Sequence, residues 1–146
     1  MRAHGLALDT PRGWEARIHR HAPTEPEEST HAVLHAANFP LPPGRGDFGT
    51  GAVERMQPDD VLVVLVEYDA GSARTTLFAR RGLPRPSPHD FDPRKLQRTI
   101  RGQSGGQWFF NTGDRAFCLY VVLGSHTRRA RLLPHVRTLL DTLTID

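Results

Sequence analysis

Histidine pairs are the residues of this sequence whose type and spacing come nearest to metal-binding chemistry. His19 and His21 are two residues apart, and His31 and His35 are four apart. Neutral imidazole binds zinc, and zinc sites use spacings of this kind. Eight histidines in 146 residues also form close pairs by chance, and four residues of strand would place two side chains far apart. The interpretation we favour is therefore solvated histidines, with no metal and no cofactor.

Ser104 is the candidate nucleophile for a hydrolytic enzyme. It lies in Gly102-Gln103-Ser104-Gly105-Gly106, which fits G-x-S-x-G and resembles the GDSGG segment of trypsin-like serine proteases. Either chemistry needs a base beside the serine and donors for an oxyanion. The residues in the protease chain order are His31 followed by Asp47, Asp59 or Asp60. Arginines rather than an apolar strand precede the segment, so we favour a glycine-rich turn and keep a small serine hydrolase as the alternative.

The glycines of Gly44-x-Gly46-x-x-Gly49 match the fingerprint of dinucleotide-binding proteins. That fingerprint needs a strand running into the first glycine and a full helix after the third. Pro42 and Pro43 precede the motif, and Pro58 limits any following helix to one or two turns. The sequence thus predicts a flexible loop over 44–51, followed by one helical turn over 52–56.

Basic residues are concentrated in one segment of the chain. The net charge is +3, and all but one of the 19 basic residues are arginine, the exception being Lys95. Residues 74–101 contain seven arginines and Lys95 against Asp90 and Asp92, whereas the first 60 residues have an excess of acid. Such a segment suits an acidic protein partner or nucleic acid, while a solvated surface is the simpler interpretation.

Asp92 before Pro93 predicts the start of a short helix over 93–100. Arg94 and Arg98 would then lie side by side, four residues apart, and an acidic partner would relieve their repulsion. The predicted partner-binding residues are Arg94, Arg98, Arg101, Gln103, Gln107 and Trp108. The competing account is that Arg98 and Arg101 pair with carboxylates of the chain itself, which are in excess in the first 60 residues. Nucleic acid bound by the basic segment 74–101 is a further alternative.

The element that must position these residues is the apolar run Val61 to Tyr68, VLVVLVEY. A short run rich in β-branched residues, apolar on both alternating faces, predicts an internal strand covered on both sides. Its predicted neighbours are runs 108–110 and 117–123, joined by an Asn111 to Asp114 turn. Because tight turns join antiparallel strands, the sheet should be mainly antiparallel.

The remaining elements are predicted from local patterns. An N-terminal hairpin should join residues 6–8 to 14–18 through the turn at Pro11 to Gly13, and a solvated loop should occupy residues 22–30. Further strands are predicted over 31–39 and 75–79. A last helix should open at Pro134, with Leu143 either ending it or beginning a terminal strand with Ile145.

Length and composition predict one α+β domain over residues 1–146, with about five to seven strands, a C-terminal helix and one or two short helices. The single cysteine, Cys118, lies in an apolar run and should be a buried thiol. The sequence shows no signal peptide and no apolar stretch long enough to span a membrane, which predicts a cytoplasmic protein without membrane contacts.

The two ends of the chain contain patterns that resemble a known family. These are Leu6-Ala7-Leu8 with Pro11-x-Gly13-Trp14, the hairpin through 117–123, and Leu139-Leu140-x-x-Leu143-x-Ile145. They are similar to the PsbP-like superfamily, which includes photosystem-associated proteins and a Ran-binding nuclear factor. The resemblance implies an antiparallel sheet flanked by helices, and a binding or assembly role more often than an enzymatic one. The sequence therefore predicts a non-catalytic protein-interaction or assembly domain, and no functional residue is transferred from the family.

Overall fold

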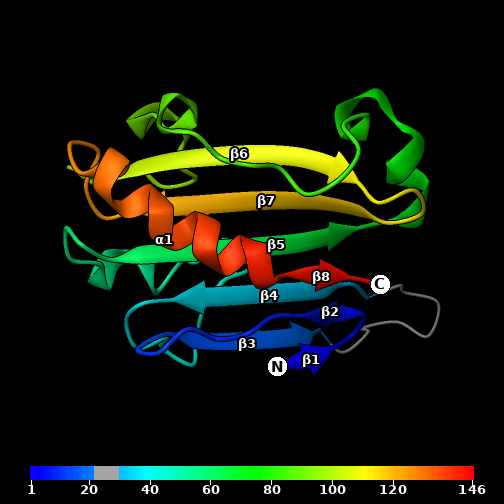
Figure 1. Ribbon diagram of the computed structural model, residues 1–146, viewed down its shortest axis with the longest axis horizontal. Coiled ribbons are helices and arrows are strands. Elements are labelled where there is room, and N and C mark those ends of the chain that lie inside the picture. Colours follow the sequence, from blue (N-terminus) through cyan, green and yellow to red (C-terminus); the bar gives the residue numbers. More distant parts are fainter. Residues whose placement is uncertain (22–29) are drawn as a thin grey trace.

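The computed structural model describes residues 1–21 and 30–146, and the loop predicted over 22–30 lies almost wholly outside them. Its main element is a five-stranded sheet with strand order β3-β4-β5-β7-β6, in which every neighbouring pair is antiparallel (Figure 1). These strands are β3 (Glu15–Arg20), β4 (Ala32–Ala37), β5 (Val61–Tyr68), β6 (Ser104–Asn111) and β7 (Ala116–Leu123). A C-terminal helix, α1 (Arg129–Thr142), crosses one face of the sheet. The predicted α+β class with an antiparallel sheet is confirmed.

Strand β5 is internal, as its apolar sequence predicts. Val63 lies opposite Ala36 of β4 on one side and opposite Val121 of β7 on the other. The first six residues of β5 are buried, so both of its faces are covered. Strand β7 is its direct neighbour, whereas β6 pairs with β7 and forms the other side of the predicted hairpin.

The face of the sheet toward α1 contains one half of the apolar core. Alternate residues of the strands point to this face, because successive side chains of a strand lie on opposite sides. Strand side chains of this half of the core include Leu34, Leu65, Phe117 and Leu119, and those of the helix are Leu132, Leu133, Val136 and Leu139. Burial of each side chain of this size contributes about 1.5–3 kcal/mol to the stability of the folded state.

The opposite face is covered by irregular chain instead of a helix. Leu41, Phe48 and Val53 of the connection between β4 and β5 pack against Leu62 and Val64 of β5. This connection includes the glycine motif, where the Gly46 N–H donates to the Thr50 carbonyl at 2.9 Å. It contains one 3-10 turn, η1 (Val53–Arg55), in agreement with the single helical turn predicted there.

A second, smaller sheet joins the two ends of the chain, with strand order β1-β2-β8. Its two-residue strands are β1 (Arg2–Ala3), β2 (Leu6–Ala7) and β8 (Thr144–Ile145). Leu6 lies opposite Ile145, and β3 pairs with β4. The predicted N-terminal hairpin is therefore wrong, although the turn exists, with Trp14 N–H donating to the Pro11 carbonyl at 3.0 Å.

The helix predicted over 93–100 is also wrong. A single 3-10 turn, η5 (Pro93–Lys95), follows the predicted cap at Asp92, and Leu96 is already extended. The next backbone N–H, that of Gln97, donates to the hydroxyl of Tyr120 at 2.7 Å, which replaces the bond that a helix would supply. Leu96 and Ile100 still contact the core, on the face opposite α1.

Two further boundaries differ from the predictions. The strand expected over 75–79 is a 3-10 turn, η3 (Thr76–Phe78), preceded by η2 (Ala70–Arg74). Helix α1 begins at Arg129, so Pro134 lies inside it and not at its start. Proline has no N–H, so one helical hydrogen bond is lost there; the buried leucines on either side hold the helix against the sheet. The terminal strand, given as the alternative to a longer helix, is confirmed as β8.

No helix within residues 1–21 and 30–146 combines the length and the apolar character that crossing a bilayer requires.

Candidate functional site

The structure disperses the six residues of the predicted contact surface. Arg94 forms an ion pair with Asp92, and Arg98 reaches Glu54 at 2.9 Å. The pair between Arg98 and Glu54 is the kind of contact that the competing account expects for Arg98. Arg101 is exposed and has no ion pair with any residue in the described part of the chain.

Gln103 and Trp108 are not on the surface. Only 3% of Gln103 and 9% of Trp108 is exposed, and the Trp108 ring packs edge to face on Phe91. The side-chain amide of Gln103 donates to the Val53 carbonyl at 2.7 Å. Gln107 is partly buried on the other face of β6, where its amide faces the Cys118 sulfur at 3.6 Å. Gln103 and Trp108 therefore belong to the interior, and only Gln107 keeps part of its side chain at the surface.

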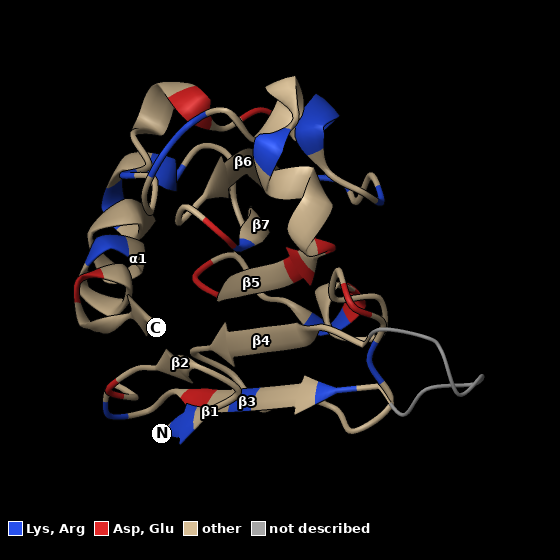
Figure 2. Ribbon diagram, turned by 90° about the vertical axis from the view of Figure 1, so that its right-hand side faces the viewer, with Lys and Arg blue, Asp and Glu red and all other residues tan. Residues whose placement is uncertain are grey.

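The basic segment instead falls into two groups, one at each end of β6. The residues around Arg94 and Arg98 lie near the start of β6, where Asp92 pairs with Gly105. Residues 74–81, which we call the arginine loop, lie at the other end, where Arg81 pairs with Asn111. Figure 2 looks onto that end of the sheet and shows basic positions on its helical turns.

The arginine loop is fixed to the sheet by one buried aromatic side chain. Phe78 packs against Tyr68 and Phe109, with ring centroids 5.3 and 5.4 Å away. The Asn111 amide donates to the Phe78 carbonyl at 2.6 Å. The residues around Phe78 are exposed, and Leu77 has 60% of its surface open.

Arg74, Arg80 and Arg81 of the arginine loop are exposed side chains, and none of them forms an ion pair with a described residue. Arg85, just beyond the loop, is instead neutralised by Asp141 at 3.1 Å. The loop thus presents three arginines without an ion pair to a described residue, beside an exposed leucine.

Ser104 has a histidine neighbour, although a different one from the sequence expectation. Its hydroxyl lies 2.8 Å from Nδ1 of His126, which follows β7, whereas His31 directly precedes β4. Ser104 is fully buried in β6, so its oxygen is not open to a substrate. The nearby Asp92 is bound to Arg94, whose hydrogen bonds lower the pKa of Asp92 to about 2. The Ser104–His126 bond therefore fastens the start of β6 to the chain entering α1.

We expect Ser104 to remain unlabelled by a fluorophosphonate probe, because a buried hydroxyl on a strand cannot reach the phosphorus atom. Intact mass measured after incubation tests this, with a Ser104→Ala variant as the control. Stoichiometric labelling of the wild type, lost on heating and absent from the variant, would establish the hydrolase alternative.

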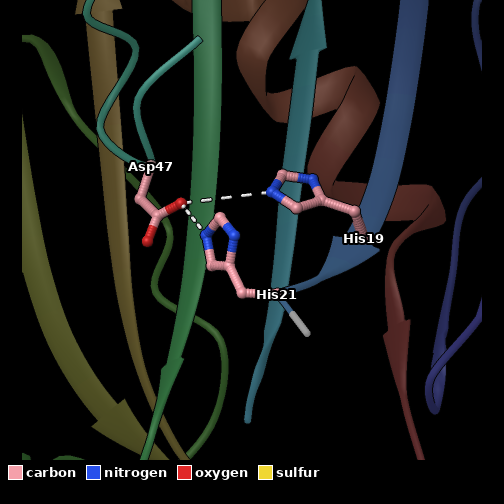
Figure 3. Close-up of side chains that lie close together, drawn as sticks. All are labelled: His19, His21 and Asp47. Atoms are coloured by element: carbon pink, nitrogen blue, oxygen red, sulfur yellow. Dashed lines mark hydrogen bonds and ion pairs between the residues drawn. The ribbon is translucent and has the colours of Figure 1, made fainter. Parts of the chain in front are cut away.

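A histidine cluster lies between β3 and the connection that covers the second face. His19 lies on β3, His21 directly follows the end of that strand, and Asp47 approaches both rings from the connection (Figure 3). Oδ1 of Asp47 is 2.6 Å from Nε2 of His21 and 4.0 Å from Nε2 of His19. One potential ligand atom from each of the three lies within 4.8 Å of the others. Burial and the neighbouring His21 lower the pKa of His19.

His35 lies behind this cluster and is fully buried, which corrects its interpretation as a solvated histidine. Arg45 Nε–H donates to its Nδ1 at 2.9 Å, and its Nε2 faces the Asp47 carbonyl at 2.7 Å. Since Nδ1 accepts, the ring is neutral with its proton on Nε2. Burial lowers the pKa of His35 to about 4. His35 thereby holds the backbone of Asp47 in place.

Part of this cluster has a signal in the sequence. The spacing of His19 and His21 places both on one face of a strand, and His35 is the only polar residue in the apolar run of β4. Both facts could have been used to predict that the three histidines lie close together on one face of the sheet. Nothing in the sequence around Asp47 indicates that its loop folds back over β3.

Comparisons of the chain with models of protein families, with curated proteins and with solved structures found no match. The resemblance to the PsbP-like superfamily stays a prediction from sequence patterns.

Proposed function

We propose that this chain is a non-catalytic interaction domain that binds an acidic protein surface through the arginine loop. The observation that supports this most is the set of exposed arginines Arg74, Arg80 and Arg81, which have no ion pair with a described carboxylate. Arginine is enriched in protein interfaces, where its planar guanidinium binds carboxylates in a bidentate manner. This surface differs from the one predicted from the sequence, which comprises Arg94, Arg98, Arg101, Gln103, Gln107 and Trp108.

The loop is suited to binding because it is ordered before a partner arrives. Phe78 and Asn111 fix its backbone, so little conformational entropy is lost when a partner contacts it. Leu77 adds exposed apolar surface between the arginines. Charge complementarity of this kind mainly raises the rate of association and selects the partner.

The test is a pull-down from native extract with the double variant Arg80→Glu/Arg81→Glu. We expect it to recover at least about tenfold less of the partner than the wild type, because two attractions become repulsions. The matched control, Arg94→Glu/Arg98→Glu, makes the same charge change at the other end of β6 and should recover the partner normally. Far-UV circular dichroism checks that all three proteins are folded.

Two outcomes would contradict the proposal. Equal recovery by wild type and Arg80→Glu/Arg81→Glu would make the arginine loop a solvated surface. Recovery that disappears after nuclease treatment and falls steeply with salt would favour the nucleic-acid alternative.

A further inference from the structure

We propose that His19, His21 and Asp47 bind a divalent transition-metal ion of the zinc class, at a site that joins the edge strand β3 to the connection between β4 and β5. This goes beyond the proposed interaction with an acidic protein and uses none of its residues. Two imidazoles and a carboxylate converge here, and one potential ligand atom from each lies within 4.8 Å of the others.

The donor set fits this class of metal. Zinc binds imidazole nitrogen at about 2.0–2.1 Å and carboxylate oxygen at about 2.0–2.2 Å, in a tetrahedron. Two ligands on such a tetrahedron are about 3.3 Å apart. The distance from Asp47 Oδ1 to His21 Nε2 is shorter, at 2.6 Å, and the distance to His19 Nε2 is longer, at 4.0 Å. Small rotations of these partly exposed side chains would open the first distance and close the second.

The backbone already places the ligands. His19 lies on β3 and His21 directly follows the end of that strand, two residues further on, and their ring centroids are 5.2 Å apart. Asp47 is held from behind by the buried His35, which is bonded to the carbonyl of the same residue. Metal sites commonly have such supporting hydrogen bonds behind their ligands, and these bonds fix the ligand orientation.

The charges around the site limit how tightly it can bind a metal cation. Metal binding requires neutral imidazole, so zinc affinity at this site should fall in acid. Arg45 is close by, but its guanidinium is bound to His35 and to the Pro42 carbonyl. Its positive charge opposes a cation, so we expect binding weaker than that of a four-ligand structural zinc site. With three protein ligands, the tetrahedron keeps a position for water or another small ligand.

Hydrogen bonding alone is the competing explanation, with Asp47 serving only as a partner of His21. A matched pair elsewhere in the chain separates the two explanations. His31 Nε2 lies 2.9 Å from Asp69 Oδ1, which is also a histidine–aspartate contact between a strand end and a loop. No second histidine joins that pair among the described residues, so His31 should not contribute to metal binding.

The experiment is a calorimetric titration of untagged protein with zinc chloride, supported by the visible spectrum with cobalt(II). We expect one ion per chain for the wild type, and an affinity at least about tenfold lower for His21→Ala and for Asp47→Asn. Loss of a residue that only supports a metal ligand typically lowers metal affinity 10–100-fold, so loss of a ligand itself should lower it at least as much. Asp47→Asn keeps the side-chain shape, so its zinc affinity can be measured even if an alanine variant is poorly folded.

His31→Ala should bind zinc like the wild type. Zinc should also raise the melting temperature of the wild type and of His31→Ala but not that of Asp47→Asn, because a ligand of the native state stabilises it. The proposal fails if folded wild type binds no zinc at about 1 mM, a weak limit for a specific site. It also fails if His31→Ala weakens binding as much as His21→Ala does.

Discussion

Replacement of Gly124 by alanine should destabilise the protein by about 3 kcal/mol, near the upper end of the range for an overpacked interior. Gly124 follows β7, and its N–H donates to the Asp60 carbonyl at 2.8 Å. A Cβ atom at this position would lie 1.9 Å from the Gln57 carbonyl oxygen and 3.1 Å from the Pro58 carbonyl carbon. These atoms belong to the backbone, so no side-chain rotation can relieve the contact. The chain that leads into β5 would have to move.

The control is Gly44→Ala, since a Cβ at Gly44 would have no neighbour within 4 Å. Neither glycine has a positive φ angle, so the two variants differ in the space available and not in backbone strain. We expect the control to change stability by no more than about 0.5–1 kcal/mol. Urea unfolding of both variants and the wild type measures the difference. Equal urea midpoints of unfolding for Gly124→Ala and the wild type would contradict the prediction, because they would show that the turn before β5 moves aside at no cost in stability.

The central part of the fold could be predicted because its signals are local. The apolar run of β5 marks an internal strand by itself, and the turn at Asn111 to Asp114 joins β6 to β7 over a few residues. That turn is closed by Thr112 N–H donating to the Arg115 carbonyl at 3.0 Å. When two strands are joined by so short a turn, the sequence pattern that predicts the strands also predicts that they pair with each other.

The ends of the chain could not be predicted, because their pairing is not local. Leu6 and Leu8 are two residues apart, as in a hairpin strand, yet Leu6 pairs with Ala3 and with Ile145 at the far end of the chain, and not with residues 14–18. Leu96 and Ile100 have helical spacing, but the Tyr120 hydroxyl and the contact between Asp92 and Gly105 give this segment other hydrogen bonds. In both places tertiary contacts outweigh local preference.

The candidate metal ligands divide in the same way. His19 and His21 share a face by the geometry of any strand, so the sequence alone could pair them. Asp47 joins them only because the connection between β4 and β5 folds back over the second face, with Phe48 packed on Tyr120 at 5.8 Å between ring centroids. That fold-back depends on the whole sheet.

Arg115→Ala should also be costly, by about 3 kcal/mol at neutral pH, because it breaks a mostly buried ion pair. Nε and one terminal nitrogen of Arg115 donate to the two carboxylate oxygens of Glu67 at 2.8 and 3.0 Å. The two side chains are only 17% and 14% exposed. Arg115 also donates to the His4 and Asp146 carbonyls, so it links the small terminal sheet to the end of β5. Arg85→Ala, which breaks an exposed pair with Asp141, should cost no more than about 1 kcal/mol.

The cost of Arg115→Ala should also depend on pH. Burial raises the pKa of Glu67, but hydrogen bonds from Arg115 and from the Ala32 N–H outweigh it, so the net pKa lies below the ordinary value of 4.5. A carboxyl group with a lowered pKa stabilises the folded state fully above its ordinary pKa, and this contribution is lost as the pH falls through the folded value. Urea unfolding of wild type and Arg115→Ala at pH 7 and at steps below pH 4.5 should therefore show the difference shrinking toward acid. A difference that stays constant down to the acid limit would mean that Arg115 acts through its carbonyl contacts at the chain ends and not through the charge of Glu67.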